Sequence, residues 1–196
     1  MRERRRELPG HEMTVLSDMT IERSGIIQPF IAIAERDSRG NSRGLSCCGY
    51  DLTLDQDLKI WPGEFRLAST REYFSMPDDV VGIIHDKSSL ARMGLAVQNT
   101  VAEPGWRGYL TLEITNHNAP RPWWAPWRKY VSPISFKTGD AIAQIIFCRV
   151  DRPVAHPYRG KYQDQESGPQ RVKPWPTSPR SVTEVMKKAA AGGDVA

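Results

Sequence analysis

Cysteine is scarce in this sequence, and so are long apolar runs. Among 196 residues there are three cysteines, Cys47, Cys48 and Cys148, with no paired spacing. Adjacent cysteines rarely bridge each other, so no disulfide framework is expected and a reducing cytoplasm is the simplest compartment. No apolar run approaches the length of a membrane span, and the basic N-terminus lacks the apolar segment of a secretory signal. We therefore predict a cytoplasmic protein with no membrane partner.

Several catalytic motifs are missing as well. Zinc-dependent nucleobase deaminases use a His or Cys ligand, a nearby Glu and a Cys-x-x-Cys pair. This chain has no Cys-x-x-Cys, and none of its four histidines lies near a cysteine pair. A catalytic zinc is therefore not expected. The sequence also shows no Walker-type phosphate loop and no recognisable Ser-His-Asp pattern.

The positive charge is modest and lies near the two ends. The formal net charge is +4, and basic residues gather in 2–6 and 171–188. A basic tail can bind nucleic acid or a membrane surface, but a solvated tail is the commoner case. We therefore expect no nucleic-acid partner.

Both ends are predicted to lie outside the core. Residues 1–12 should form a flexible basic extension, with Met13 as an alternative start. Residues 169–196 should form a Pro-rich basic tail. Within this tail, a capping box at Ser181–Glu184 predicts a short helix that ends at Gly192.

The region between the ends, residues 13–168, predicts one mainly β domain. A short helix is expected within Thr14–Arg23, with Ser17 or Asp18 as its cap. Beyond it, short runs rich in β-branched and aromatic residues alternate with turn residues. These runs are Tyr50–Leu54, Glu64–Ala68, Val80–His85, Leu110–Thr115 and Ala141–Val150. Such spacing is typical of an all-β barrel or sandwich.

A polar insert rich in Pro and Trp occupies residues 117–138 and contains Trp123, Trp124 and Trp127. It is too polar for a core strand, and Trp is favoured at interfaces because one ring buries a large area. We expect the insert to pack on a neighbouring subunit or to border the mouth of the site. Stacking on single-stranded nucleic acid is the alternative.

One short segment combines cations with hydroxyls. It contains Lys87, Ser88, Ser89 and Arg92, and such groups suit phosphate oxygens. A donor-rich loop between two apolar runs is a good phosphate cradle. Taken alone, an ordinary turn entering a helix would explain the same residues.

Two carboxylates follow this loop. In a strand over Leu110–Ile114, the apolar residues would share one face and Glu113 would share the other with threonines. Alternation alone leaves open whether Glu113 faces water, and Glu103 lies in a Pro-Gly turn where exposed carboxylates are common. A carboxylate beside a positioned water suits proton transfer. The combination predicts a site for a phosphorylated small molecule with acid–base chemistry beside it.

In this order, the motifs resemble those of the dCTP deaminase family, within the dCTP deaminase/dUTPase superfamily. The resemblance runs from about Leu16 to Gln165. It rests on Leu16–Asp18, Ile27–Phe30, Cys48–Leu52, Lys87–Leu95, Pro104–Gly108 with Leu112-Glu113, Gly139–Gln144, Tyr158 and Lys161–Gln165. It implies a compact, distorted β-barrel of the jelly-roll-like dUTPase type (β-clip) with short helices. It also implies a homotrimer with active sites at the subunit interfaces.

The resemblance implies zinc-independent hydrolytic deamination of dCTP to dUTP and ammonia, in pyrimidine deoxynucleotide metabolism. The triphosphate would be carried as a magnesium complex. By position, Glu113 would be the proton shuttle, Ser88 would hold the water and Arg92 would organise the loop. The resemblance also assigns substrate-binding residues by position. Lys87, Ser89, Tyr158 and Lys161 would contact phosphate, Gln165 would close on the nucleotide, and Glu103 and Trp106 would contact the deoxyribose.

The sequence also departs from the family pattern. Lys87 stands where the family usually has Arg, Glu103 replaces Asp, and Ala96–Glu103 is shorter than usual. A dUTPase, with Glu103 activating water, or a bifunctional enzyme that forms dUMP is therefore the alternative. Glu113 and Arg92 favour deamination. A third hypothesis is that the protein is a non-catalytic, nucleotide-binding regulatory protein.

Overall fold

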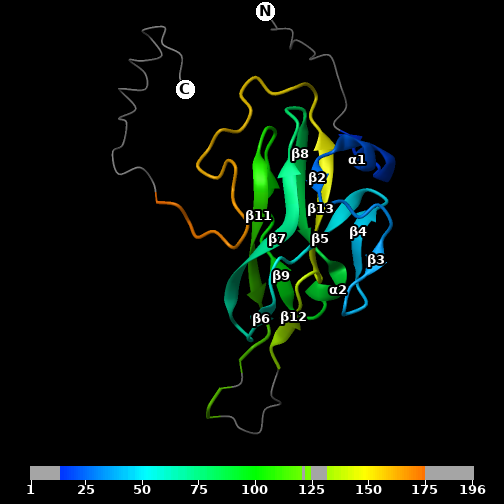
Figure 1. The fold of residues 1–196 in the computed structure, drawn as a ribbon. Coiled ribbons are helices and arrows are strands. Elements are labelled where there is room, and N and C mark those ends of the chain that lie inside the picture. Colours follow the sequence, from blue (N-terminus) through cyan, green and yellow to red (C-terminus); the bar gives the residue numbers. More distant parts are fainter. Residues whose placement is uncertain (1–13, 121, 125–131, 175–196) are drawn as a thin grey trace, which may run out of the picture.

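The computed structural model describes residues 14–120, 122–124 and 132–174 (Figure 1). The expected extension over 1–12, Trp127 and the expected C-terminal helix lie outside these residues. Among the residues described, no helix is long and apolar enough to cross a membrane.

Strands dominate the described chain, which confirms the mainly β prediction. The short elements at the start are β1 (Thr14–Val15), α1 (Asp18–Ser24), β2 (Ile27–Gln28), β3 (Glu35–Arg36), β4 (Ser42–Ser46), β5 (Gly49–Thr53) and β6 (Leu58–Ile60). They are followed by β7 (Phe65–Ser75), β8 (Val80–Asp86), α2 (Ser88–Ala91), β9 (Leu95–Val97), β10 (Val101–Ala102), β11 (Arg107–Asn116), β12 (Ile134–Phe136) and β13 (Ala141–Arg149).

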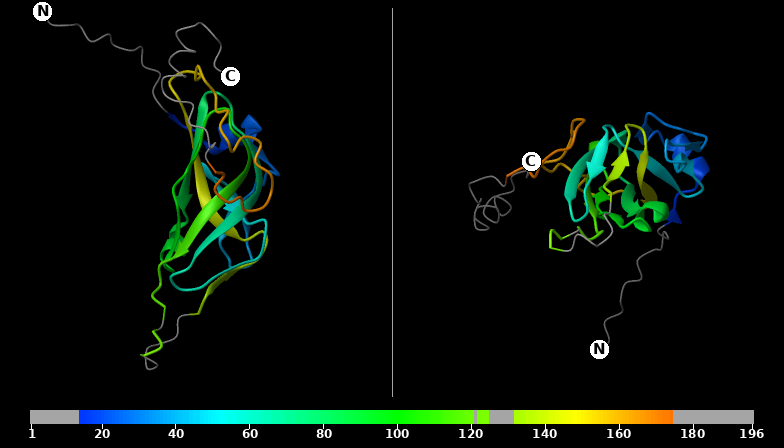
Figure 2. Two further views of the ribbon diagram at one scale, coloured as in Figure 1. Left: turned by 90° about the vertical axis from the view of Figure 1, so that its left-hand side faces the viewer. Right: turned by 90° about the horizontal axis from the view of Figure 1, so that it is seen from below.

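The strands form two curled sheets and a small ribbon, which enclose a common interior (Figure 2). The larger sheet has the order β10-β8-β13-β5-β4-β3, with β1 paired to β13. The second sheet has the order β2-β7-β11-β9, and β12 pairs with β6. All these strand pairs are antiparallel. The arrangement is the distorted barrel that the resemblance implies.

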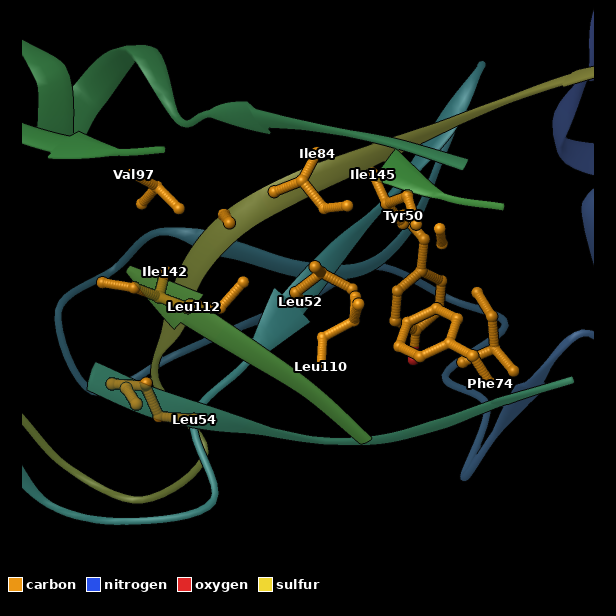
Figure 3. Close-up of a cluster of buried hydrophobic side chains, with 14 of the residues drawn as sticks. Tyr50, Leu52, Leu54, Phe74, Ile84, Val97, Leu110, Leu112, Ile142 and Ile145 are labelled. Atoms are coloured by element: carbon orange, nitrogen blue, oxygen red, sulfur yellow. The ribbon is translucent and has the colours of Figure 1, made fainter. Parts of the chain in front are cut away.

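The core lies between the two sheets (Figure 3). Tyr50 and Leu52 from β5 meet Phe74 from β7 and Leu112 from β11, and all four are completely buried. Each such side chain contributes about 1.5–3 kcal/mol of transfer free energy when it leaves water. Strand β13 is buried along most of its length, and it lies inside the larger sheet with partner strands on both edges.

A buried carboxylate joins the two sheets. Glu72 on β7 accepts hydrogen bonds from the backbone N–H of Thr53 on β5 (3.0 Å) and from its hydroxyl (2.7 Å). Burial nevertheless raises the pKa of Glu72 above its ordinary value. Polar groups buried between sheets need such partners, since an unpaired one costs stability.

Two predicted elements differ from those observed. The predicted cap is confirmed, because the helix begins at Asp18, whereas Thr14–Val15 at the start of the predicted range pairs with the end of β13 as a strand. Ser17 is its N-cap, and Gly25, in the left-handed region, ends it. Strand β7 continues seven residues past the predicted end at Ala68, to Ser75. A neighbouring strand, β11, extends far enough to pair with it there.

Candidate active site

Glu113 lies on β11, whose residues alternate strictly between the core and the outer face. Leu110, Leu112 and Ile114 are buried, whereas Thr111 and Glu113 are half-buried on the opposite face. Pairing with β7 on one side and β9 on the other holds this part of β11 in the middle of its sheet. The predicted side-chain alternation is confirmed, but Glu113 does not face open water.

A cavity of about 690 Å³ lies in front of Glu113. It brings together five of the predicted site residues, which are Glu103, Trp106, Glu113, Tyr158 and Gln165. The remaining lining residues are Phe65, Leu67, Thr100, Val101, Leu110, Thr111, Tyr162, Gln170, Arg171 and Val172. The lining is largely apolar with a few polar groups, as is typical of a pocket for a small molecule.

The carboxylate of Glu113 is only partly satisfied. Its Oε2 atom is buried and has no hydrogen-bond partner among the residues that the structure describes. Burial raises the pKa of Glu113 above its ordinary value, because the charged form loses hydration. A buried, unpartnered carboxylate is costly, so such a group in a cavity is a candidate for acid–base chemistry.

The second carboxylate reaches the cavity from a tight turn. The N–H of Trp106 donates to the carbonyl of Glu103 (3.0 Å) across Pro104 and Gly105, and Gly105 has φ +83°. This is the pattern of a type II turn, in which Gly is favoured at the third position. A side chain at Gly105 would also collide with Pro157, since its Cβ would lie 2.5 Å from that ring. The turn leaves the Glu103 side chain exposed.

The segment 158–172 lies against β11 (Figure 1). Several of its residues line one side of the cavity. The amide of Gln165 donates to the carbonyl of Tyr109 (2.7 Å) and to the hydroxyl of Thr111 (2.9 Å). The indole N–H of Trp106 donates to the carbonyl of Tyr162 (2.8 Å). Gln165 thus anchors the segment to its own chain, and its contact with a nucleotide stays a prediction.

The predicted phosphate loop lies at a different place on the chain. Lys87, Ser88 and Ser89 line a second concavity of about 470 Å³, together with Arg36, Gly40, Asn41, Ser42, Ser46, Asp51, Asp86 and Gln144. Ser88 and Ser89 are exposed at the start of α2. Arg92 is exposed at the end of α2, where its backbone N–H donates to the carbonyl of Ser88. Its side chain lines neither cavity.

Lys87 is already paired within the chain. Its Nζ lies 2.6 Å from Oδ1 of Asp51 on β5, and both side chains are nearly completely buried. Ser42 donates a further hydrogen bond to the other oxygen of Asp51 (2.7 Å). Lys161 lies in neither lining; its Nζ lies over the ring of Tyr162 and donates to the carbonyl of Lys173. Phosphate contact by either lysine stays a prediction.

Sequence reasoning missed several lining residues. Strand alternation places Thr111 on the same face as Glu113, but the sequence prediction did not include Thr111 among the site residues. No local signal marks Thr100, Arg171 or Arg36, because only the tertiary fold brings them to the cavities. No cluster of three or more His, Cys, Asp or Glu that could hold a metal ion occurs within the described part of the chain.

A family model and the sequence relatives of this chain point to the same protein family. A family model described as dCTP deaminase-like matches residues 51–150. The dUMP-forming dCTP deaminase of Persephonella marina is 36% identical over 112 residues, covering 57% of this chain and 56% of that protein. The dCTP deaminase of Roseiflexus castenholzii is 32% identical over 191 residues, covering 78% of this chain and 96% of that protein.

Among solved structures, the native dUTPase of EIAV is similar, with a TM-score of 0.43 and 22% identity, covering 58% of this chain and 84% of that one. The two sequence relatives carry the assignment, since one of them aligns along nearly its whole length. The chain belongs to the dCTP deaminase family.

Proposed function

We propose that this protein is a zinc-independent dCTP deaminase, which converts dCTP and water to dUTP and ammonia. The observation that carries the proposal is the buried oxygen of Glu113, which has no partner in the described part of the chain, at the wall of a cavity of about 690 Å³. Family membership supports the same reaction, because the relatives are named dCTP deaminases.

In this mechanism Glu113 moves protons between water and the base. Its carboxylate takes a proton from the water as the water oxygen bonds to C4 of cytosine, and passes that proton to N3. The remaining hydroxyl proton is then transferred through Glu113 to the amine. The C4–N bond breaks, ammonia leaves and C4 keeps the oxygen as a carbonyl. The pKa of Glu113, raised by burial, suits both directions of transfer.

The other predicted residues have supporting positions in this mechanism. The buried ring of Trp106 would pack against the deoxyribose, and the exposed carboxylate of Glu103 would accept a hydrogen bond from its 3′-hydroxyl. Tyr158 lines the same cavity. Ser88 would hold the attacking water, and Arg92 would organise the loop that presents it.

The reaction site is assembled from more than one copy in this proposal. Within one chain, Glu113 and the Ser88 loop line separate concavities. Phe65 and Val101 line the Glu113 cavity and are each more than half exposed. A homotrimer would cover such apolar side chains and bring the Ser88 loop of one copy to the Glu113 cavity of the next.

A second activity is favoured by one observation. Glu103 and Glu113 line the same cavity, so one carboxylate could serve the base and the other the phosphates. In a bifunctional enzyme, Glu103 would activate a water that attacks the phosphate chain of dUTP and releases dUMP and pyrophosphate. The P. marina relative carries the dUMP-forming name.

One assay separates these functions. Pure protein is incubated separately with dCTP and with dUTP in the presence of magnesium, and ammonia, dUTP, dUMP and pyrophosphate are measured. Equal amounts of ammonia and dUTP from dCTP support the deaminase. Ammonia with dUMP and pyrophosphate supports the bifunctional enzyme, and dUMP from dUTP without ammonia from dCTP supports a dUTPase. Nucleotide binding with no product would support a regulatory protein.

Metal dependence gives a separate prediction. Magnesium accompanies the triphosphate as part of the substrate, so lowering free magnesium should reduce ammonia release. A zinc-selective chelator, added with magnesium in excess, should leave the rate unchanged, because the sequence lacks the ligand pattern of zinc-dependent deaminases. Inactivation by that chelator, reversed by zinc alone, would contradict the mechanism.

The pH dependence follows from the environment of Glu113. The Glu113 carboxylate must be ionised to take a proton from water. We therefore expect kcat/KM for dCTP to fall as the pH drops through the pKa of Glu113. Burial raises that pKa, which moves the fall above the ordinary glutamate value of about 4.3. A pH–rate profile of ammonia release measures the pH at which kcat/KM falls. If kcat/KM falls only at or below the ordinary glutamate pKa, in enzyme that recovers fully at neutral pH, Glu113 is excluded as the general base.

A further inference from the structure

The β3–β4 hairpin lies beside the phosphate loop and carries three arginines, Arg36, Arg39 and Arg43. Two contacts join it to the loop. The hydroxyl of Ser89 donates to the side-chain oxygen of Asn41 (3.0 Å), and Nζ of Lys87 lies 3.4 Å from the hydroxyl of Ser42. The hairpin therefore forms one wall of the concavity that Ser88 and Ser89 line.

The tip of the hairpin is held in place by two buried aspartates. Asp37 accepts hydrogen bonds from the backbone N–H groups of Asn41 (2.7 Å) and Ala141 (3.0 Å). Asp140 accepts from both the backbone N–H and the hydroxyl of Ser38. These bonds attach the hairpin to the start of β13, so its side chains are presented from a fixed backbone.

Strand register places Arg36 and Arg43 on opposite faces of the hairpin, and Arg39 lies in the turn between its strands. Arg36 is directly opposite Ser42, so the two side chains share a face of the hairpin, and that face looks onto Lys87 and Asp51. Arg43 is on the other face, opposite Glu35, with which it forms an ion pair (2.7 Å). Arg39 lies over the ring of Phe136 and donates to the carbonyl of Ser135.

Arg36 is the exposed cation of this concavity. Its guanidinium makes one hydrogen bond within the described residues, to the carbonyl of Gly40 (3.1 Å), which leaves further N–H donors available. Lys87, by contrast, is buried and neutralises Asp51. Asp86 also lines the concavity, and one of its oxygens accepts the backbone N–H of Val97.

We propose that Arg36 is a phosphate-binding residue, and that it supplies the planar, bidentate contact to the nucleotide triphosphate which Lys87 cannot make. The proposal rests on the proposed function and deepens it. A guanidinium can form two parallel hydrogen bonds to one phosphate, whereas an ammonium acts as a point charge. Ser89, a predicted phosphate contact, supplies a hydroxyl in the same concavity.

The test compares Arg36→Ala with Arg39→Ala as the matched control. Both variants remove one positive charge from the same hairpin, but Arg39 lines a different concavity. Calorimetric binding of inorganic triphosphate and of dCTP, each with magnesium, gives the dissociation constants, and ammonia release gives kcat and KM. Arg36→Ala should weaken binding of both ligands by about 10- to 100-fold, as expected for hydrogen bonds to charged groups. It should raise KM more than it lowers kcat.

Arg36→Lys provides the second variant. It should recover only part of the affinity, because it restores the positive charge without the planar guanidinium that forms two parallel hydrogen bonds. The proposal is overturned if Arg36→Ala binds triphosphate as tightly as the parent, if Arg39→Ala weakens binding equally, or if the parent binds neither ligand. Weakened triphosphate binding in a protein that releases no ammonia would support the phosphate site and contradict the deaminase. Normal ammonia release with an unchanged KM in Arg36→Ala would support the deaminase and contradict the phosphate site at Arg36.

Discussion

Replacing Glu113 by Gln should reduce ammonia release from dCTP by about 10²- to 10⁴-fold, the range expected for loss of a proton-transfer group. The amide keeps the shape of the side chain but cannot take a proton from water and return it. Nucleotide affinity should change little, because Glu113 acts on the base while Arg36 and the Ser88 loop hold the phosphates in our proposal. Single-turnover ammonia release and calorimetric dCTP binding measure the two effects separately.

Glu166→Gln is a suitable control for this experiment. It also neutralises one carboxylate, but Glu166 is exposed and lies outside the cavity lining. Its ammonia release should stay close to that of the parent. Near-normal turnover by the Glu113 variant would remove Glu113 from the mechanism, and an equal loss in both variants would show that the effect is not specific to the cavity.

Lys87→Met should lower the free energy of unfolding by about 3–5 kcal/mol, because it leaves Asp51 buried without its cation. The Ser42 hydroxyl still donates to that carboxylate but cannot neutralise it. Urea unfolding, measured at one protein concentration for every variant, reports the change. A loss of this size would show that Lys87 stabilises the fold, whether or not it also touches phosphate.

Lys137→Met is the matched control for Lys87→Met. Lys137 pairs with Asp57 at 2.7 Å, nearly the same separation as in the buried pair, but both side chains are largely exposed. Exposed ion pairs contribute little because water screens them, so this variant should unfold close to the parent. Joint replacement of Asp51 by Leu and Lys87 by Met should recover stability, since no unpaired charge remains. Equal unfolding of the buried and exposed single variants would contradict this account.

The parts of the fold that local pattern controls could be predicted from the sequence. Along β11, apolar side chains at every second position placed Glu113 on the face opposite the core, and the structure confirms this face. The alternation could not show that a segment near Gln165 folds back over the same face. Pattern reports the orientation of a side chain, whereas burial depends on what the rest of the chain brings against it.

Pairings between distant segments account for the rest. Thr14–Val15 lies at the edge of the predicted helix range, but it forms a strand whose partner residues lie more than 130 residues further along the chain. Lys87 looked like a free cation until Asp51, from β5, came within 2.6 Å. The insert shows the same limit, since Trp123 is 92% exposed and what covers it stays a prediction.

The position of β13 has a consequence for synthesis of the protein. This strand lies between β8 and β5 inside the larger sheet and also pairs with β1, yet it is the last strand of the described chain to be made. While the chain is still on the ribosome, β5 and β8 are exposed along the edges that β13 will fill. Unpaired apolar strand edges promote aggregation. The nascent domain therefore completes its larger sheet only after residue 149 leaves the exit tunnel, which makes translation speed and chaperone capture relevant to its yield.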